Sequence, residues 1–328
     1  MLVDGGPPGV MAKTSHPGVR VRQAGALLRQ LDAYRDANLS FDLSVLTHID
    51  SDHIGGLLAA YRRAEYRQVI GKNVWFNSAR LIAAQLKKTQ PPESDNLIYP
   101  IVGSETSVNQ AIDLDELLNE HQPDRQLITT ENATHSFDWG TIDILSPTII
   151  QLSDLLDQWI KERPDTRTSA KKDDYAYSIK DLQASDNFSP DTSVKNASSI
   201  GILLKCSAGS ALLLGDAFSS TIVDSLRRLK YSEENKLVVD VCKVSHHGSK
   251  GNTCEEFLSL IEVRYFIIST NGAKQLPDKR TLARILKHNP NSKIVFNYPS
   301  LKNKIFTEDE LNNWHHNFHD SNELVLIE

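Results

Sequence analysis

The sequence predicts a mixed α/β fold, of the α/β or α+β class, in one domain over residues 1–328. Short apolar runs rich in β-branched residues alternate along the chain with segments in which apolar residues recur at helical spacing. The 328 residues, 40% of them hydrophobic, can bury a substantial core, and this length allows one large domain or two. The chain has no internal repeats and no heptads. We therefore predict a single domain of strands and helices.

In the first half of the chain, helices are expected to alternate with strands. Over residues 19–37, apolar residues at helical spacing predict an amphipathic helix that leads into a buried strand at residues 43–46. Helical spacing returns over residues 54–61, whereas alternation over residues 66–76 predicts a strand. The other elements expected on the same grounds are helices over residues 78–88, 112–120 and 149–160 and a strand over residues 137–145.

The second half is expected to begin with a polar insertion. Residues 161–195 are dominated by Lys, Asp, Ser and Thr with few aromatic residues, so we predict a loop. Its place before a strand that carries a candidate site residue suggests a lid over the active site, and an inert surface loop is the alternative. Beyond it we expect strands after Ile200 and over residues 211–216 and 238–244, and a helix over residues 279–288.

Residues 46–56 contain four side chains of metal-binding type within six positions, at the turn between a strand and a helix. These side chains are His48, Asp50, Asp52 and His53. Imidazole nitrogen with carboxylate oxygen suits zinc, manganese or iron, and the lack of a nearby Cys argues against a structural thiolate site. A polar turn with Asp52 as a helix cap explains one or two of the four residues but not all of them. Gly55 and Gly56 then allow close backbone approach.

Two later segments add candidate ligands at the ends of expected strands. Asp216 follows an apolar run and Gly215, where its carboxylate could contact two ions, although a Gly-Asp turn is the simpler explanation. His246 and His247 follow residues 238–244 and precede Gly248. If the strand continues through them, they point in different directions, so that one binds metal and the other faces substrate. The sequence does not assign these two roles, and a surface histidine pair is the alternative.

These segments together resemble the metallo-β-lactamase superfamily. Residues 48–53 are similar to its His-x-His-x-Asp-His signature, with Asp50 in place of the second His, as in the ComEC-type, competence-protein-like branch and its stand-alone relatives. Three further matches follow in the order of that branch: Asn196-Ala-Ser-Ser-Ile200, Leu212-Leu-Leu-Gly-Asp216 and Val241-Cys-Lys-Val-Ser-His-His-Gly-Ser249. The resemblance implies a four-layer αββα sandwich and a metal-dependent hydrolase, with a phosphodiesterase or nuclease favoured.

The resemblance also implies how the ligands are shared. One ion, Zn²⁺ or Mn²⁺, is expected at His48, Asp50, Asp216 and one of His246 or His247, and a second ion, where present, at Asp52, His53 and Asp216. A metal-activated water is the expected nucleophile. Asp52 is expected to orient this water, and the non-ligating member of His246 and His247 to contact phosphate or protonate the leaving group.

The chain departs from the family pattern in three places. Residues 142–147 offer no counterpart of the third-motif His, and Leu276 stands where relatives place a His before the Pro. Asp4, in the Asp-Gly-Gly turn, lies almost at the start, so the first strand or strands of the sheet are expected to be absent, with an upstream start or a partner completing the sheet edge. Asp4 itself is expected either to support the metal site from behind the ligands or to shape this turn.

Composition and these departures define the alternatives. The formal net charge of −6 argues against a non-specific polyanion binder, so the bound metal is expected to attract the phosphodiester or nucleic-acid substrate. Hydrolysis of a small ester, lactone or amide is one alternative, and a degenerate metal-binding subunit of a multi-protein system, such as a defence system, is another. Three Cys without CxxC spacing predict free thiols and a cytoplasmic location. Neither an export signal nor a membrane anchor is expected.

Overall fold

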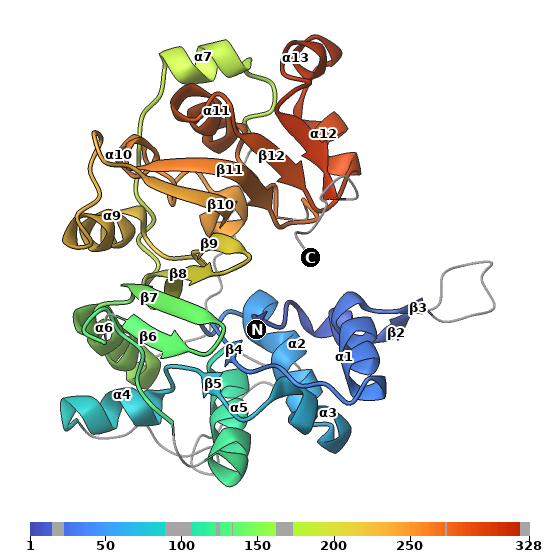
Figure 1. The fold of residues 1–328 in the computed structure, drawn as a ribbon, viewed down its shortest axis with the longest axis vertical. Helices are drawn as coiled ribbons and strands as arrows, with labels where there is room; N and C mark the ends of the chain where they lie inside the picture. Colours follow the sequence, from blue (N-terminus) through green and yellow to red (C-terminus); the bar gives the residue numbers. More distant parts are fainter. Residues whose placement is uncertain are drawn as a thin grey trace. The chain divides into compact units, whose positions relative to one another are not determined.

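The computed structural model describes residues 1–14, 23–88, 107–122, 125–132, 134–161, 173–272 and 274–321. Within these ranges the chain has a mixed α/β fold, as predicted, and it divides into two compact units (Figure 1). Unit 1 comprises residues 1–128 and 149–164, and unit 2 comprises residues 129–148 and 165–328. The single domain and the four-layer αββα arrangement stay predictions.

Unit 1 contains a small parallel sheet with helices packed beside it. The strand order is β1 (Leu2–Val3), β4 (Ser44–Val45) and β5 (Val74–Trp75), so a two-residue strand precedes Asp4. Around the strands lie the helices α1 (Ala26–Asp36), α2 (Ser51–Tyr61), α3 (Ala64–Ile70), α4 (Ala79–Leu86), α5 (Ser107–His121) and α6 (Ile149–Lys161). A 3₁₀ turn, η1 (Pro8–Met11), and a hairpin of β2 (Lys13–Thr14) and β3 (Gln23–Ala24) complete the described part of unit 1. Apolar side chains of α1, α2 and α4 are fully buried, which accounts for their helical spacing in the sequence.

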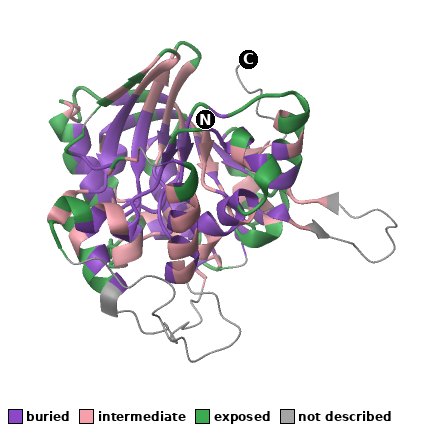
Figure 2. Ribbon diagram, turned by 90° about the horizontal axis from the view of Figure 1, so that it is seen from below, coloured by how far each residue is buried: buried purple, intermediate pink, exposed green. Residues whose placement is uncertain are grey.

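Unit 2 is built on an eight-stranded mixed sheet of order β13-β12-β11-β10-β9-β8-β7-β6. The strands are β6 (Thr134–Phe137), β7 (Gly140–Ser146), β8 (Gly201–Cys206), β9 (Gly209–Leu213), β10 (Leu237–Lys243), β11 (Ile261–Ile268), β12 (Lys293–Phe296) and β13 (Phe318–Asp320). Strands β6 to β9 pair antiparallel in sequence order, and β9 to β13 pair parallel. Strands β7, β8, β11 and β12 contribute most of the buried strand residues, and Figure 2 shows buried segments in strands and helices alike.

The helices of unit 2 cover the sheet and include one built from the polar insertion. They are α7 (Ile179–Ala184), α8 (Val194–Ala197), α9 (Ser219–Arg228), α10 (Glu255–Ser259), α11 (Lys279–His288), α12 (Ser300–Ile305) and α13 (Glu308–Asn313), with a 3₁₀ turn, η3 (Ser245–Gly248). Helix α7 packs against α11 and buries Ile179 and Leu182 in the core. Part of the predicted insertion, residues 162–172, lies outside the described residues, and the lid role stays a prediction.

The helix expected over residues 19–37 begins only at Ala26, and its earlier part lies partly outside the described residues. The strand predicted over residues 66–76 is wrong, because α3 occupies its first part and only Val74–Trp75 is extended. Tyr66, Val69 and Ile70 are buried at positions i, i+3 and i+4, which is a helical face. The same apolar residues also suited alternation, so periodicity over so short a run did not distinguish the two structures.

None of the helices in the described ranges combines the length and the apolar character needed to span a lipid bilayer.

Candidate metal centre

In unit 1, the candidate ligands follow the carboxyl end of β4. Strands β1 and β4 run parallel, so the residues that follow them, Asp4 and Thr47–His48, emerge at the same edge of the sheet. Asp50 occupies the position just before α2 without making a side-chain capping hydrogen bond, and Asp52 lies in the first turn of this helix. The alternative in which Asp52 caps the helix is therefore wrong, because Asp50 occupies the cap position and its side chain makes no capping hydrogen bond.

The structure brings His48, His53 and Asp50 together. The rings of the buried His48 and His53 have centroids 4.2 Å apart, and His48 Nε2 lies 3.7 Å from Asp50 Oδ2. This nitrogen–oxygen distance is too long for a hydrogen bond. Two imidazoles and a carboxylate thus share a small volume at the sheet edge, with the half-buried Asp52 next to His53 in the chain.

Asp4 holds His53 and the strand end in place. Its Oδ2 lies 2.7 Å from His53 Nδ1 and accepts a hydrogen bond of 2.9 Å from Thr47 Oγ1, while its Oδ1 accepts one of 2.8 Å from the Thr47 amide. Burial opposes ionisation of Asp4, but the charge and hydrogen bond of His53, the Thr47 amide and the charge of His48 outweigh it and hold its pKa below the usual value. An ionised Asp4 favours the proton on His53 Nδ1.

Glycines fix this Asp4–His53 contact through close backbone packing. A Cβ on Gly56 would lie 2.0 Å from the Gly5 carbonyl oxygen, and the Gly56 amide donates a hydrogen bond of 2.7 Å to the Gly6 carbonyl. The Gly5 amide in turn donates to the His53 carbonyl at 2.8 Å. The Asp-Gly-Gly turn is thereby held against the first turns of α2, as expected of glycines that allow close backbone approach.

In unit 2, Asp216 lies beyond the end of β9 in a hydrogen-bonded turn. Gly215 has a left-handed backbone with φ of 53°, and the buried Asp216 follows it. The Asp216 amide donates to Ser199 Oγ at 3.0 Å, and its carbonyl accepts from Asn252 Nδ2 at 3.1 Å. The Ser-Ser segment recognised in the sequence therefore supports the backbone of Asp216.

The two histidines do not continue strand β10, so the condition under which they were expected to point in different directions is not met. Both lie in η3, where His246 (φ 46°, ψ 50°) and His247 (φ 54°, ψ 19°) have left-handed backbones. Such conformations are costly for residues with a side chain and persist only where surrounding contacts hold them. Here the His246 amide donates to the Gly215 carbonyl at 3.0 Å, and Ser245 Oγ donates to the Ala217 carbonyl at 2.8 Å.

Each histidine of this pair has its Nδ1 against oxygen acceptors. His247 Nδ1 lies 2.6 Å from the Ser269 carbonyl oxygen, and His246 Nδ1 lies 2.9 Å from Asn252 Oδ1 and 3.3 Å from Asp191 Oδ2. His246 Nε2 lies 3.8 Å from Asp216 Oδ2. Burial lowers the pKa of His246, but Asp191 and Asp216 outweigh it and raise this pKa above the usual value. Sequence reasoning missed Asp191 and Asn252, which belong to no motif that it used, and it gave Ser269 no role.

The donor types fit a divalent cation. The described residues include groups of His and Asp side chains that could hold a metal ion, and these groups contain no sulfur ligand. Cys242 is fully buried, which raises the pKa of its thiol to about 12 and keeps it protonated. Imidazole and carboxylate donors suit zinc, manganese and iron alike, so the donor set leaves the identity of the ion open.

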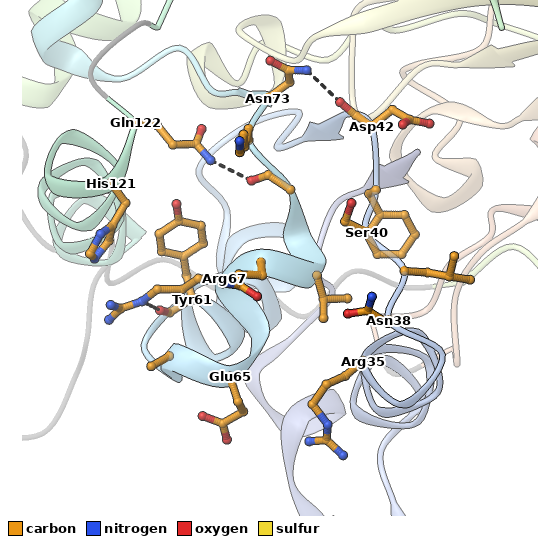
Figure 3. A pocket seen from close by; sticks show the side chains of 17 residues that line it. Arg35, Asn38, Ser40, Asp42, Tyr61, Glu65, Arg67, Asn73, His121 and Gln122 are labelled. Atoms are coloured by element: carbon orange, nitrogen blue, oxygen red, sulfur yellow. Dashed lines mark hydrogen bonds between the residues drawn. The ribbon is translucent and has the colours of Figure 1, made fainter.

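A separate cavity of about 720 Å³ lies in unit 1, at the amino ends of β4 and β5 and thus at the sheet edge opposite His48 (Figure 3). Its polar side chains tie neighbouring loops together. Arg67 Nε donates to the Tyr61 carbonyl, Gln122 Nε2 to the Gly71 carbonyl and Asn73 Nδ2 to the Asp42 carbonyl. The cavity is therefore distinct from the candidate metal residues of unit 1.

Comparison with known proteins gives one partial similarity. No family model matches the chain. A segment of 140 residues is 31% identical to ComE operon protein 3 from Bacillus subtilis (strain 168), and it makes up 39% of this chain and 17% of that protein. The chain thus resembles a limited part of a much longer protein. Membership of the metallo-β-lactamase superfamily stays a prediction.

Proposed function

We propose that this chain is a metal-dependent hydrolase that cleaves phosphodiester bonds, in nucleic acid or in a smaller ester. The observation that supports this best is common to three histidines. In His53, His246 and His247, Nδ1 lies against an oxygen acceptor, at 2.7, 2.9 and 2.6 Å respectively. Metal-ligating histidines almost always have their other ring nitrogen engaged in this way.

The proposed ligands for one ion are His48, Asp50, Asp216 and one of His246 or His247, and those for a second ion are Asp52, His53 and Asp216. Zn²⁺ or Mn²⁺ is the proposed metal, and when bound it supplies Lewis acidity and lowers the pKa of water. Asp52 orients the attacking water by accepting a hydrogen bond from it. The non-ligating histidine of the pair contacts the phosphate or carries a proton to the leaving oxygen.

A phosphodiester is the proposed substrate because two ligand sets suit a reaction in which both the attacking and the leaving oxygen gain charge. The partial similarity to ComE operon protein 3 supports a nucleic-acid or related phosphodiester substrate through the resemblance to the ComEC-type branch. With a net charge of −6, the chain depends on bound cations to attract the phosphate.

Purified protein tests this proposal directly. It should take up at least one Zn²⁺ or Mn²⁺ per chain in elemental analysis, and it should hydrolyse bis-p-nitrophenyl phosphate in a reaction that a chelator stops. A panel of lactones and p-nitrophenyl esters run in parallel should give much lower turnover. Metal uptake with lactone or ester turnover alone would contradict the phosphodiester assignment, and absence of uptake would contradict the proposal as a whole.

One observation supports a second candidate function, that of a metal-binding subunit without turnover. Leu276, which stands where a ligand histidine is expected, is an apolar side chain buried to all but 4% of its surface. A Leu276→His variant tests this alternative. Phosphodiester turnover that appears only in the variant would favour the non-catalytic subunit, whereas turnover already present in the unmodified chain excludes it.

A further inference from the structure

The second part of the polar insertion is fixed to helix α11 by buried charges. Asp174 accepts hydrogen bonds from the amides of Lys279 and Arg280, at 2.7 and 3.0 Å, where α11 begins. Asp186 pairs with the buried Arg284 through two contacts of 2.6 and 2.8 Å. These charge-assisted contacts hold the chain on both sides of α7 and determine where the following residues lie.

The residue delivered by this segment is Asp191, and its carboxylate is fully engaged by protein donors. Oδ1 accepts from the Ser193 amide at 2.9 Å, and Oδ2 accepts from Asn196 Nδ2 at 2.6 Å and from Asn252 Nδ2 at 3.0 Å, besides facing His246 Nδ1. With both oxygens occupied, Asp191 is suited to orient a neighbour and not to bind metal or accept a proton.

The same network determines which nitrogen of His246 carries the proton. Asn252 Nδ2 donates both to Asp191 and to the Asp216 carbonyl, which fixes the orientation of the Asn252 amide. Its Oδ1, the acceptor of the amide, therefore faces His246 Nδ1 at 2.9 Å. Nδ1 meets two acceptors, Asn252 Oδ1 at 2.9 Å and Asp191 Oδ2 at 3.3 Å. The Asn196 Nδ2 donor also lies 3.3 Å from it, but this group makes its shorter hydrogen bond, of 2.6 Å, to Asp191 Oδ2. The shortest contact of Nδ1 is thus with an acceptor, which assigns it as the donor. His246 Nε2 is then left with its lone pair and lies 3.8 Å from Asp216 Oδ2.

We propose that Asp191 is a positioning residue of the metal site: with Asn252 it holds His246 as the Nδ1–H tautomer and presents Nε2 beside Asp216 as a metal ligand. This inference rests on the metal site of the proposed function, and it assigns to His246 a ligand role that the sequence left open between the two histidines. The distance from His246 Nε2 to Asp216 Oδ2 is 3.8 Å. Two ligand atoms of one tetrahedral ion, each about 2.1 Å from it, lie about 3.4 Å apart, so a small movement would let both bind the same ion. Groups that orient a ligating histidine contribute about 10- to 100-fold to metal affinity.

The experiment compares Asp191→Ala and Asp191→Asn with Thr192→Ala, a substitution at the exposed neighbouring position. Ring-nitrogen NMR spectra of ¹⁵N-histidine protein without metal, near pH 8.5, report the tautomer, and the His246 signals are those missing from a His246→Gln variant. Chelator competition with Zn²⁺ and Mn²⁺ gives metal affinity, and melting curves report whether each variant is folded.

We expect His246 to carry its proton on Nδ1 in the unmodified chain and in Thr192→Ala. In Asp191→Ala the proton should redistribute toward Nε2, and metal affinity should fall about 10- to 100-fold. Asp191→Asn keeps the side-chain shape, so it replaces the Ala variant as the test if that variant does not fold. Its metal affinity should fall about tenfold. An unchanged tautomer and unchanged metal affinity in folded Asp191→Asn would overturn the proposal. The tautomer measurement needs no metal, so it tests Asp191 even if the unmodified chain binds no ion and the proposed function fails.

Discussion

The two units orient their histidines by different means. In unit 1, Asp4 reaches His53 because glycines let the Asp-Gly-Gly turn pack against α2, and all these residues lie in short motifs that can be recognised in the sequence. In unit 2, the orienting groups of His246 come from two segments, at Asp191 and Asn252, joined by a polar network. The contact of Asp4 with His53 therefore depends on close backbone packing, whereas the contacts of Asp191 and Asn252 with His246 depend on buried side-chain hydrogen bonds.

The largest expected loss of metal and turnover comes from replacing Asp216, because it is the one residue proposed as a ligand of both ions. Asp216→Ala should lose bound metal and lower phosphodiester turnover by about a thousandfold or more, since charge stabilisation by metal is worth several kcal/mol. Elemental analysis and steady-state kinetics measure both quantities. Asp224→Ala, at an exposed position of α9, is the control and should change neither. Full metal content in Asp216→Ala would refute the bridging role.

The next largest effect concerns the polar network that stabilises unit 2. Glu310 accepts a hydrogen bond of 2.7 Å from Lys279 Nζ, which is 1% exposed, and one of 2.9 Å from the Ile179 amide. Glu310→Ala leaves the buried Lys279 ammonium without its carboxylate partner, although the Tyr175 carbonyl at 3.3 Å still accepts a hydrogen bond from it. The variant should lower the free energy of unfolding by about 3 kcal/mol in urea titration. Glu256→Ala removes an exposed pair with Arg227 and should cost less than about 1 kcal/mol. Equal losses in the two variants would contradict this account.

The contribution of Glu310 should also depend on pH. Burial opposes its ionisation, but the bonds from Lys279, Thr307 and Ile179 outweigh it and lower its pKa from the usual 4.5. The stabilisation is therefore complete above the pKa of the unfolded chain and is lost as pH falls through the lower pKa of the folded state. The difference in unfolding free energy between unmodified protein and Glu310→Ala should shrink below about pH 4.5. A difference that stays constant down to about pH 3 would contradict the lowered pKa.

A smaller effect tests the glycine packing of unit 1. A Cβ on Gly56 meets the Gly5 carbonyl at 2.0 Å, so Gly56→Ala must displace the turn that carries Asp4 and should cost about 2 kcal/mol. Metal affinity should fall with it, because the Asp4–His53 contact shifts. Gly9→Ala is the matched control, since a Cβ there meets no atom within 4 Å. Equal unfolding midpoints for the two variants would show that close packing does not hold Asp4.

The sequence allowed the α/β class and six of the thirteen α-helices in the described residues to be predicted, because the periodicities of these six are long enough to identify an element type. It also singled out His48, Asp50 and His53, which lie close together in unit 1, and their role as metal ligands stays a prediction. The strand prediction over residues 66–76 was wrong because the three apolar residues fit both the alternation of a strand and the spacing of a helix. The left-handed backbone of His246 and His247 carries no spacing signal, since it depends on contacts with Gly215 and Ala217 from another strand end.

Asp191 was missed for a related reason. It lies in a polar segment whose composition predicts a loop, and only tertiary contacts such as Asp186 with Arg284 place it at His246. Asn252 lies only six residues beyond His246, closer in the chain than Asp191. It was missed because an Asn that follows a Gly is usually a turn residue. Residues that orient ligands thus escape prediction where they lie far from the ligand in the chain, as Asp191 does.

Anomalous diffraction from crystals grown with Zn²⁺ tests the central claim most directly. We predict an anomalous peak about 2.0–2.1 Å from Nε2 of His246, with Nδ1 of this residue still bonded to Asp191 and Asn252. A peak at Nδ1, or no peak at the histidines and aspartates of either unit, would contradict the proposed metal centre.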